Sequence, residues 1–517
     1  MTLADKHRKT NPADLSDLII SGDRVLTQAE FRERGQRVAA GLKAMGLTEG
    51  ESIAVVMRND LAFLEAMLGA DIAGIYVAAV NWHANADEAA HIITDSGARL
   101  IVIHADLMAQ FGAALPDDIP VLQVSTPPEI AAAYRVAEAA APRDRDWEAW
   151  RDSHAPYDGP PAAPRSNIIY TSGTTGNPKG IVREPAVGEM ATRIRQVMAY
   201  AYGISADEPI RTAVTGPLYH SAPNVYSFHA ARSPGGLVVL QARFDAEGLL
   251  RLIHDYRLTH LHLVPTMFVR LLKLPAEVRA RYDVSSLRYV VHGAAPCPAD
   301  VKSAMIDWFG PVIGEYYGAS ETGAAIALRP EEAAAHPDTV GRPTPWTRIE
   351  IVGADGKVCS TGEIGEIYLK IDNYPAFEYR NRPGAADKVR RGDLVSAGDI
   401  GYLDAEGYLH LCGRKSDMII SGGVNIYPAD IEAALMTIPG VRDAAAFGIP
   451  DREFGESIAA YVATELSEEA LRQDLAHRLA RYKIPRVFRT VSAIPREDSG
   501  KIRKKALREA LLAELAG

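Results

Sequence analysis

The stretch YTSGTTGNPKG, residues 170–180, contains the residue types that could hold a chain of phosphates. Its glycines allow backbone N–H groups to approach an anion closely, its hydroxyls can donate hydrogen bonds, and Lys179 carries positive charge. The stretch is not a Walker phosphate loop, which requires Gly-Lys-Ser/Thr, because here Lys179 follows Pro178 and precedes Gly180. From composition alone, a flexible surface turn is the alternative interpretation.

Four later segments also combine glycine with residues that could do chemistry. They contain Glu321 in EYYGASET, Asp399 in SAGDIGYLD, Arg414 in GRKSDMIISGG and Lys501 in PREDSGKIRKKAL. A carboxylate suits Mg²⁺ or the hydroxyls of a sugar, and a basic side chain suits phosphate. Taken singly, these residues also have ordinary structural explanations: a solvated glutamate, a turn aspartate, a hinge salt bridge and a basic tail.

In this order, the five segments resemble the motifs of the adenylate-forming superfamily. This superfamily includes acyl-CoA synthetases, luciferases and peptide-synthetase adenylation domains. The resemblance runs from about residue 20 to residue 510 and is strongest to bacterial fatty-acyl and aryl-acid CoA ligases. Three positions depart from the usual motifs: Ser320 and Ala397 replace threonines, and Ser416 stands where many relatives have Asp or Lys.

The resemblance implies an ATP-dependent and Mg²⁺-dependent ligase that forms an acyl-adenylate and releases AMP and pyrophosphate. Two anions must meet in such a reaction, so the site must neutralise charge and fix their orientation. Because the sequence ends soon after Lys501 without a carrier domain, we expect coenzyme A as the acyl acceptor. A free-standing acyl carrier protein is the alternative acceptor, and the missing Gly-Lys-Ser/Thr disfavours a P-loop kinase or ATPase.

The resemblance also implies roles for individual residues. Lys501 and Lys179 are the predicted catalytic lysines, and His220 in PLYHSAP is predicted beside the acyl carboxylate, although a lone histidine is more often structural. Glu321 and Thr171 are predicted to hold Mg²⁺. The predicted nucleotide and coenzyme A contacts are Thr171, Ser172, Gly173, Thr174, Thr175 and Gly176; Gly293, Ala294 and Ala295; Glu315, Tyr316, Tyr317, Gly318 and Ser320; Asp399 and Arg414; and Ser421, Gly422 and Gly423.

The expected acid-binding segments are apolar and aromatic. NVYSF, VHGAA and YYGAS contain no obvious fixed charge, which favours a fatty, aryl or other bulky hydrophobic monocarboxylic acid. An amino acid would need an aspartate for its ammonium group. His260 and His262 alternate along a predicted strand without a third ligand nearby, so we interpret them as core or cleft residues rather than as a metal site.

The elements that must position these residues alternate between helix and strand. Helices are predicted at 26–45, 60–73 and 246–256, and strands at 52–57, 99–104, 237–240 and 261–264. This alternation predicts layered α/β architecture with parallel strands. The Pro-rich, charged stretch 141–165 is predicted to be a loop, and the short strands of 339–412 predict a small antiparallel or barrel-like subdomain.

The last hundred or so residues predict a separate small α+β domain. Helices are expected at 428–436, near 468–480 and at the C-terminus, with a strand at 443–447. We therefore predict an N-terminal domain of residues 1–413 that binds ATP and the acid. A mobile C-terminal domain of residues 414–517 would carry Lys501 and rotate near Ser416.

Composition limits the partners. The chain has 517 residues and a net charge of −10, which argues against a nucleic-acid partner. Its three cysteines lack the spacing of a disulfide framework or a zinc site, and no signal-peptide core or apolar run of about 18 residues is present. We expect a cytoplasmic protein without an integral membrane segment, with small-molecule substrates; a homodimer is left open.

Overall fold

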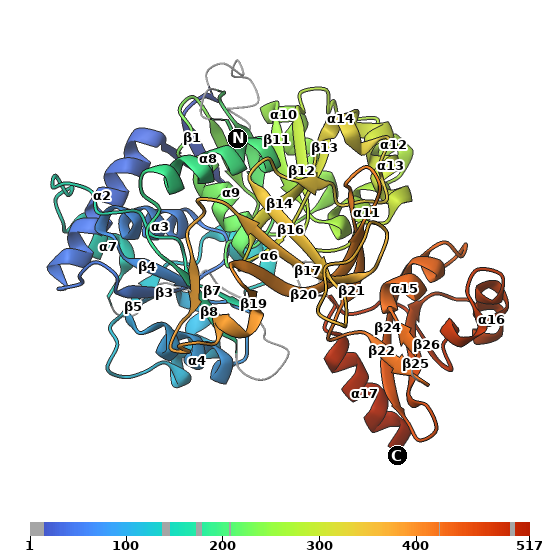
Figure 1. The fold of residues 1–517 in the computed structure, drawn as a ribbon. Coiled ribbons are helices and arrows are strands. Elements are labelled where there is room, and N and C mark those ends of the chain that lie inside the picture. Colours follow the sequence, from blue (N-terminus) through green and yellow to red (C-terminus); the bar gives the residue numbers. More distant parts are fainter. Residues whose placement is uncertain are drawn as a thin grey trace.

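The computed structural model describes residues 15–136, 145–171, 178–205, 208–422, 424–496 and 502–516. It shows a mixed α/β protein with a large N-terminal part and a smaller C-terminal part, which confirms the predicted fold class (Figure 1). Several predicted site residues lie outside the described ranges: Ser172, Gly173, Thr174, Thr175, Gly176, Gly423 and Lys501.

A nine-stranded sheet forms the centre of the N-terminal part. Its strand order is β15-β14-β13-β12-β11-β9-β10-β1-β2, and the strands from β13 to β1 pair in parallel. The parallel strands are short runs rich in Val and Leu that are buried on both faces, as expected where helices cover both sides of a sheet. The strands are β1 (Leu18–Ser21), β2 (Arg24–Thr27), β9 (Arg211–Val214), β10 (Leu237–Leu240), β11 (His260–Leu263), β12 (Tyr289–His292), β13 (Ile313–Ala319), β14 (Gly323–Leu328) and β15 (Arg342–Pro343).

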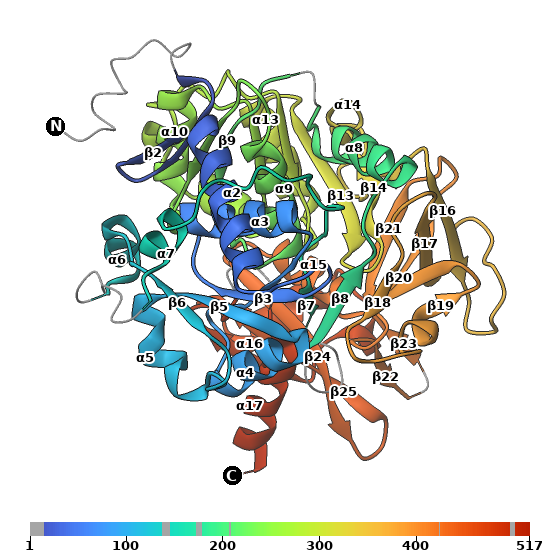
Figure 2. The ribbon, with the colours of Figure 1, turned by 90° about the vertical axis from the view of Figure 1, so that its left-hand side faces the viewer.

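A second, four-stranded sheet is parallel throughout and is seen clearly in Figure 2. Helix α2 (Gln28–Ala44) begins at a capping box between Thr27 and Glu30, so the predicted helix at 26–45 starts two residues late, after β2. Helix α3 (Leu61–Ala73) packs against α2 and is buried along most of its length. The strands are β3 (Ser52–Val56), β4 (Tyr76–Ala79), β5 (Ala98–His104) and β6 (Val121–Val124).

The longer helices of the N-terminal part cover the two sheets. Helix α8 packs on β13 and β14, and α9 packs on β9 and β10. These helices are α4 (Ala86–Ser96), α8 (Glu189–Tyr202), α9 (Ser221–Ala231), α10 (Ala246–Tyr256), α11 (Pro265–Leu272) and α13 (Ala299–Phe309). Shorter helices are α5 (Met108–Phe111), α6 (Pro128–Tyr134), α7 (Trp147–Asp152), α12 (Ala276–Arg279) and α14 (Pro330–Ala333).

The prediction of a loop at 141–165 is wrong over residues 147–152, because Trp147–Asp152 forms α7. The Asp146 side chain caps this helix by accepting from the Ala149 N–H, and the Trp147 side chain is fully buried. Arg151 donates from Nη1 to Oε2 of Glu65 at 2.7 Å. The helix is thus anchored by a residue far away in sequence, and its own proline-rich surroundings did not reveal it.

Residues 339–412 form mostly antiparallel structure, as predicted. A five-stranded sheet has the order β16-β17-β20-β19, with β21 paired to β20, and a three-stranded sheet has the order β18-β8-β7. The strands are β7 (Ile169–Thr171), β8 (Lys179–Arg183), β16 (Thr347–Val352), β17 (Gly365–Ile371), β18 (Phe377–Tyr379), β19 (Arg390–Arg391), β20 (Leu394–Leu403) and β21 (Leu409–Arg414).

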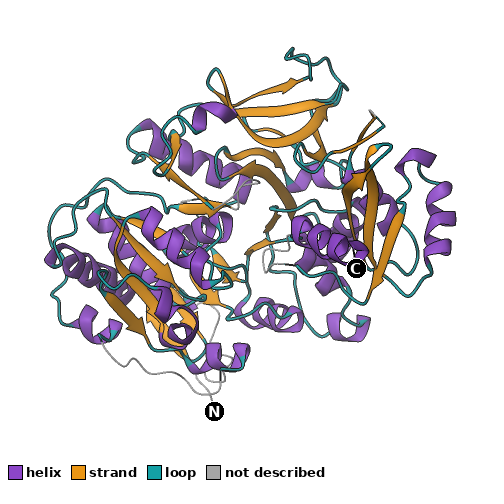
Figure 3. Ribbon diagram, turned by 90° about the horizontal axis from the view of Figure 1, so that it is seen from below, coloured by secondary structure: helices purple, strands orange, loops and turns teal. Residues whose placement is uncertain are grey.

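The C-terminal part has its own sheet and its own hydrophobic core, and it stands beside the larger part in Figures 1 and 3. The proposed domain boundary at Gly413–Arg414 lies at the end of β21, and the first strand of the C-terminal sheet is β22. The elements are β22 (Ile419–Ser421), β23 (Val424–Ile426), α15 (Pro428–Met436), β24 (Asp443–Asp451), β25 (Gly455–Ala463), α16 (Glu468–Ala476), β26 (Val487–Val491) and α17 (Lys504–Ala516).

None of the helices in the described ranges has both the length and the apolar composition needed to cross a bilayer.

Candidate functional site

A large cavity of about 1300 Å³ is lined by both parts of the protein. Ala429 and Arg503 of the C-terminal part contribute to its wall, and Arg503 lies two residues after Lys501. Most of the predicted site residues that the structure describes also line it. These are Thr171, Lys179, His220, Ala294, Ala295, Glu315, Tyr316, Tyr317, Gly318, Ser320, Glu321, Asp399 and Arg414.

Three predicted contacts, Gly293, Ser421 and Gly422, are not among the lining residues. A Cβ atom on Gly293 would lie 2.6 Å from a ring carbon of Tyr316, so the absent side chain makes room for that tyrosine. Gly422 has a φ of +58° and donates its N–H to the Phe454 carbonyl at 2.8 Å, which makes it a tight turn in the C-terminal sheet. Their predicted ligand contacts stay predictions.

Tyr317, Asp399 and Arg414 come from three strands and meet at the cavity wall. Asp399 of β20 and Arg414 of β21 are register partners, and their side chains approach with 3.4 Å between Nε and Oδ1. The hydroxyl of Tyr317 donates to the other oxygen, Oδ2, of Asp399 at 2.8 Å. Burial, followed by the neighbouring carboxylate, raises the pKa of Tyr317 well above its ordinary value, so its hydroxyl stays protonated as a donor.

Glu321 and Lys179 are joined through a tyrosine that the sequence analysis missed. The hydroxyl of Tyr379 donates to Oε1 of Glu321 at 3.0 Å, and the Lys179 ammonium lies over the Tyr379 ring, 5.2 Å from its centroid. Burial is the first cause, and Glu321 the second, of the raised pKa of Tyr379. We call the region of Lys179, Glu321, Asp399 and Arg414 the charged end of the cavity.

The turn that presents Ser320 and Glu321 depends on glycine. A Cβ atom on Gly318 would lie 1.8 Å from the carbonyl oxygen of Gly323, where no side chain can fit. The ladder between β13 and β14 shifts register beside Gly318, so the two strands separate into the turn. The close approach therefore explains why this turn tolerates only glycine at position 318.

The Arg183 side chain fixes the same turn by hydrogen bonds to its backbone. Its guanidinium donates to the carbonyls of Pro375 at 2.6 Å, Ser320 at 2.7 Å and Glu321 at 2.8 Å. The guanidinium also stacks over the ring of Tyr374, and burial lowers the pKa of Arg183. Because Arg183 ends β8, which begins at Lys179, one short strand connects the predicted phosphate-binding segment to the Glu321 turn.

His262 of β11 and Glu315 and Tyr316 of β13 are buried polar residues that line the cavity. Lys302 lies 2.5 Å from Oε2 of Glu315 and donates to the Thr339 carbonyl at 2.8 Å. The hydroxyl of Tyr316 lies 3.2 Å from Nε2 of His262, a buried residue of β11 that also lines the cavity. Burial lowers the pKa of His262 to about 4, so its imidazole is neutral at pH 7.

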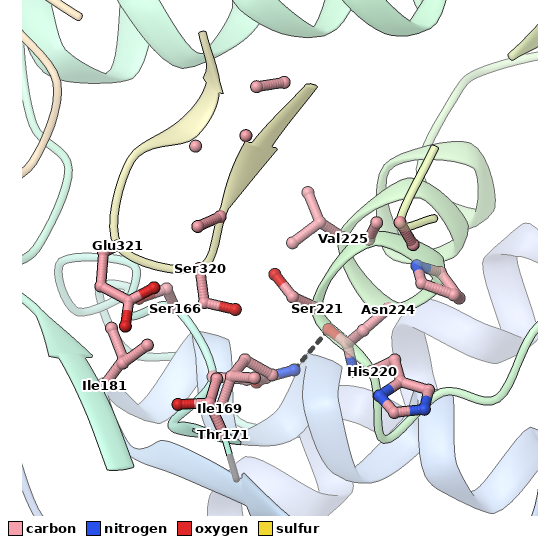
Figure 4. Close-up of a pocket in the computed structure, with 18 of the residues that line it drawn as sticks. Ser166, Ile169, Thr171, Ile181, His220, Ser221, Asn224, Val225, Ser320 and Glu321 are labelled. Carbon is pink, nitrogen blue, oxygen red and sulfur yellow. Dashed lines mark hydrogen bonds between the residues drawn. The ribbon is translucent and has the colours of Figure 1, made fainter. Parts of the chain in front are cut away.

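The cavity continues along one face of α9, which starts after His220. Asn224 is tied in place, because Nδ2 of Asn167 donates to its Oδ1 at 2.5 Å and its own Nδ2 donates to the Leu218 carbonyl at 2.7 Å. In Figure 4, Ser221 and Val225 of α9 face Ser320 and Glu321 across the cavity. We call this region the α9 arm. Its lining residues include Ser221, Ala222, Asn224, Val225, Phe228, His229 and Arg232, with Met67 and Asp71 of α3 and Ile194, Val197 and Met198 of α8.

Comparison with known proteins shows to which family the chain belongs. A family model described as "AMP-binding enzyme" matches residues 5–374, and one described as "AMP-binding enzyme C-terminal domain" matches residues 430–501. The chain belongs to the AMP-binding enzyme family. It is 32% identical over 494 residues to a long-chain-fatty-acid–CoA ligase, FadD13, of Mycobacterium tuberculosis, covering 95% of this chain and 94% of that protein.

Two further relatives show the range of the family. The chain is 30% identical to the fatty acid–[acyl-carrier-protein] ligase ScoC of Streptomyces coeruleorubidus, covering 98% of this chain and 94% of that protein. The crystal structure of ATP-bound MatB from Rhodopseudomonas palustris superposes with a TM-score of 0.82 at 25% identity, covering 98% of each chain. The predicted family, the predicted class of AMP-forming acid–thiol ligase and ATP as the nucleotide are therefore confirmed.

Tyr379 and Arg183 are the site residues that the sequence analysis did not identify. Tyr379 lies in FEYRN, far from the motifs in sequence, and reaches Glu321 only because β18 pairs with β8. Arg183 follows the predicted phosphate-binding segment directly, and a charged residue at the end of an apolar strand was the available signal.

Proposed function

We propose that the protein joins a hydrophobic monocarboxylic acid to coenzyme A in two steps through an acyl-adenylate. The observation that carries this proposal is that one cavity unites a charged end with a largely apolar α9 arm. In the first step, an oxygen of the acid attacks the α-phosphorus of ATP, and the bond to the β-phosphate breaks to release pyrophosphate. In the second step, the thiol attacks the acyl carbon, forming the thioester and releasing AMP.

The residues of the charged end suit the first step. Lys179 would neutralise the phosphates that leave as pyrophosphate, together with the segment 172–176 outside the described residues. Tyr317 would stack on the adenine, and Asp399 would accept hydrogen bonds from the ribose hydroxyls. The pairing of Asp399 with Tyr317 and Arg414 fixes its two oxygens before ATP binds, which lowers the cost of orientation.

We propose Glu321 and Thr171 as the residues that hold Mg²⁺. A carboxylate and a hydroxyl are oxygen donors of the type that Mg²⁺ prefers, and both side chains line the cavity. The hydrogen bond from Tyr379 to Oε1 orients the Glu321 carboxylate. When bound, Mg²⁺ would screen the negative charge of the departing phosphates.

The α9 arm suits the acid. Its walls are formed mainly by Met67, Val225, Phe228, Ile194 and Met198. Ser221 lies at the end of the arm that faces Ser320 and Glu321, where the carboxylate of a bound acid would sit (Figure 4). His220 precedes it in sequence and also lines the cavity. Apolar walls favour a fatty, aryl or other bulky hydrophobic acid, because its burial removes apolar surface from water.

We propose that the C-terminal domain, residues 414–517, rotates between the two steps. Lys501 would contact the acid and the α-phosphate during adenylation, and the presence of Arg503 in the cavity wall supports an approach of this segment. Rotation near Ser416 would then withdraw Lys501 and bring the segment 421–423 to the pantetheine of coenzyme A. On the sequence grounds given above, we propose the cytoplasm as the location.

A carrier protein is the alternative acceptor, and the similarity to an acyl-carrier-protein ligase is the observation that favours it. Pyrophosphate release should be measured with ATP, Mg²⁺ and a panel of fatty and aromatic acids, with and without coenzyme A. We expect acid-dependent pyrophosphate, and an acyl-CoA thioester when coenzyme A is present. Pyrophosphate without the thioester would indicate the carrier alternative, and no acid-dependent pyrophosphate would reject adenylation.

A further inference from the structure

The end of the α9 arm farthest from His220 is polar, although the walls leading to it are apolar. Asp71, His229 and Arg232 all line the cavity there. Nη1 of Arg232 lies 3.2 Å from Oδ2 of Asp71, and the Asp71 side chain is only 13% exposed. The Arg232 guanidinium also lies over the Phe228 ring, 5.0 Å from its centroid. An apolar acid that filled the arm would therefore meet polar groups at its far end.

His229 offers a hydrogen bond at this end of the arm. Within the described residues, no hydrogen bond joins its half-buried imidazole to another residue. Its backbone carbonyl accepts from the Arg232 N–H at 3.2 Å and from the Ser233 hydroxyl at 3.3 Å. Burial, followed by the charge of Arg232, lowers the pKa of His229 to about 4. The ring is therefore neutral at pH 7 and has one N–H donor and one nitrogen acceptor.

The charges at this end favour a neutral group over a second carboxylate. The negative charge of Asp71 balances that of Arg232, and His229 is neutral, so the polar end has no net charge to offer an anion. An alkyl end would cover the His229 ring nitrogens without giving them a partner, which is unfavourable. The Arg232 side chain is 47% exposed and keeps Asp71 as its partner, so it can turn a further N–H group towards the arm. A neutral oxygen would accept from either group.

We propose that the acid has an apolar body and carries a hydroxyl or ketone oxygen at its far end, which His229 and Arg232 recognise. This inference rests on the proposed function. From Ser221 to His229, α9 rises about 12 Å, which is the approximate separation of the carboxylate from the oxygen. Asp71 would act through Arg232 by holding the guanidinium in place.

Three acids of equal length test this inference on the whole protein. Decanoic acid, its terminal-hydroxy derivative and the corresponding dicarboxylic acid should be compared by kcat/KM for pyrophosphate release. We expect the hydroxy acid to be preferred over decanoic acid by about fivefold, as expected for one hydrogen bond. The dicarboxylic acid should be the poorest of the three. A preference for decanoic acid, or for the dicarboxylic acid, would overturn the inference.

Substitutions test whether His229 and Arg232 cause the preference for the hydroxy acid. His229→Phe and Arg232→Gln should each bring the ratio of hydroxy acid to decanoic acid close to one, whereas His229→Asn should retain most of it, because asparagine still donates and accepts. Arg270→Gln is the matched control, since the Arg270 guanidinium lies over the Phe244 ring and outside the cavity lining. A loss of folded protein lowers both rates and leaves their ratio unchanged.

The outcomes distinguish a failure of this inference from a failure of the proposed function. If both His229→Phe and Arg232→Gln keep the wild-type ratio, the inference is wrong while acid activation stands. If no acid in this series or in the earlier panel releases pyrophosphate, the proposed function itself is wrong.

Discussion

The charged end of the cavity and its α9 arm hold their side chains in different ways. At the charged end, Asp399 has Tyr317 and Arg414 as partners, and Glu321 has Tyr379. Along the α9 arm, Val225 and Phe228 project from one helix face without hydrogen bonds to fix their side chains, and Val225 is 37% exposed. Hydrogen-bonded groups have one arrangement, whereas a helix face accepts many apolar residues of similar size. Under the proposed function, this difference suits the charged end to the nucleotide, which stays the same, and the arm to the acid, which can vary.

The largest expected effect concerns Lys501, which we propose acts together with the charged end during adenylation. Lys501→Ala should lower adenylation about 100- to 1000-fold, because a positive group that stabilises the transition state is removed. Thioester formation from supplied acyl-adenylate should change little. Both half-reactions should be measured on the same preparation, with Lys505→Ala as the control. Equal loss in both half-reactions would contradict a role confined to adenylation.

The next effect is on the stability of the charged end. Arg183→Met removes three hydrogen bonds and leaves buried carbonyls without a donor, so the free energy of unfolding should fall by about 3 kcal/mol. Arg183→Lys should recover part of this loss. Thermal or denaturant unfolding of both variants provides the measurement, and an unchanged midpoint for Arg183→Met would show that the turn does not depend on this clamp.

Narrowing the α9 arm should weaken the use of bulky acids and leave ATP binding unchanged. Val225→Phe places a larger ring in the cavity, so kcat/KM for long or bulky acids should fall about 10- to 100-fold while the KM for ATP stays near its wild-type value. Short acids should be nearly unaffected. Steady-state kinetics with acids of increasing length test this expectation, and a parallel rise in the KM for ATP would mean that the two ends are not independent.

A smaller effect is expected for the hydrogen bond to Glu321. Tyr379→Phe keeps the ring beneath Lys179 but removes the hydroxyl, so the Mg²⁺ concentration for half-maximal activity should rise about fivefold, as expected for one hydrogen bond. Tyr374→Phe serves as the control, since its ring stacks on Arg183 and does not contact Glu321 through a described hydrogen bond. Identical Mg²⁺ titrations for Tyr379→Phe and the wild type would contradict the proposed metal site.

The smallest effect is a pH dependence of stability in the α9 arm. The pKa of His229 is lowered from 6.5 to about 4 by burial, so the unfolded chain binds a proton at pH values where the folded protein does not. The contribution of the neutral His229 to the free energy of unfolding is fully present above pH 6.5 and is lost as the pH falls towards 4. At pH 5 the loss is on the order of 1 kcal/mol. Unfolding of wild type and His229→Phe across this range should show the difference, and parallel curves would contradict it.

The sequence was sufficient to predict that the residues of the charged end lie in one cavity, because they belong to short motifs whose order is itself informative. It also predicted helices such as Ala246–Tyr256 and Pro428–Met436 to the residue, since apolar spacing, the capping Asp245 and a proline in the first turn are local signals. It did not reveal α7, whose burial depends on Glu65 of α3. It did not reveal Tyr379 either, because that residue reaches Glu321 through the pairing of β18 with β8. Long-range pairings of this kind leave no periodic pattern in a single sequence.

The polar end of the α9 arm is also a feature that the sequence alone does not reveal. His229 and Arg232 are spaced as neighbours on a helix face, but nothing near them in sequence indicates that Asp71 of α3 lies opposite. The three residues form a group only after α3 and α9 have packed around the cavity.

The transfer of an isotope tests the central claim most directly. The acid should be labelled with oxygen-18 in its carboxylate and incubated with the protein, ATP, Mg²⁺ and coenzyme A, and the products analysed by mass spectrometry. If the carboxylate oxygen attacks the α-phosphorus, one labelled oxygen will appear in AMP and none in pyrophosphate. Unlabelled AMP, or label in ADP or phosphate, would contradict an acyl-adenylate formed in this cavity.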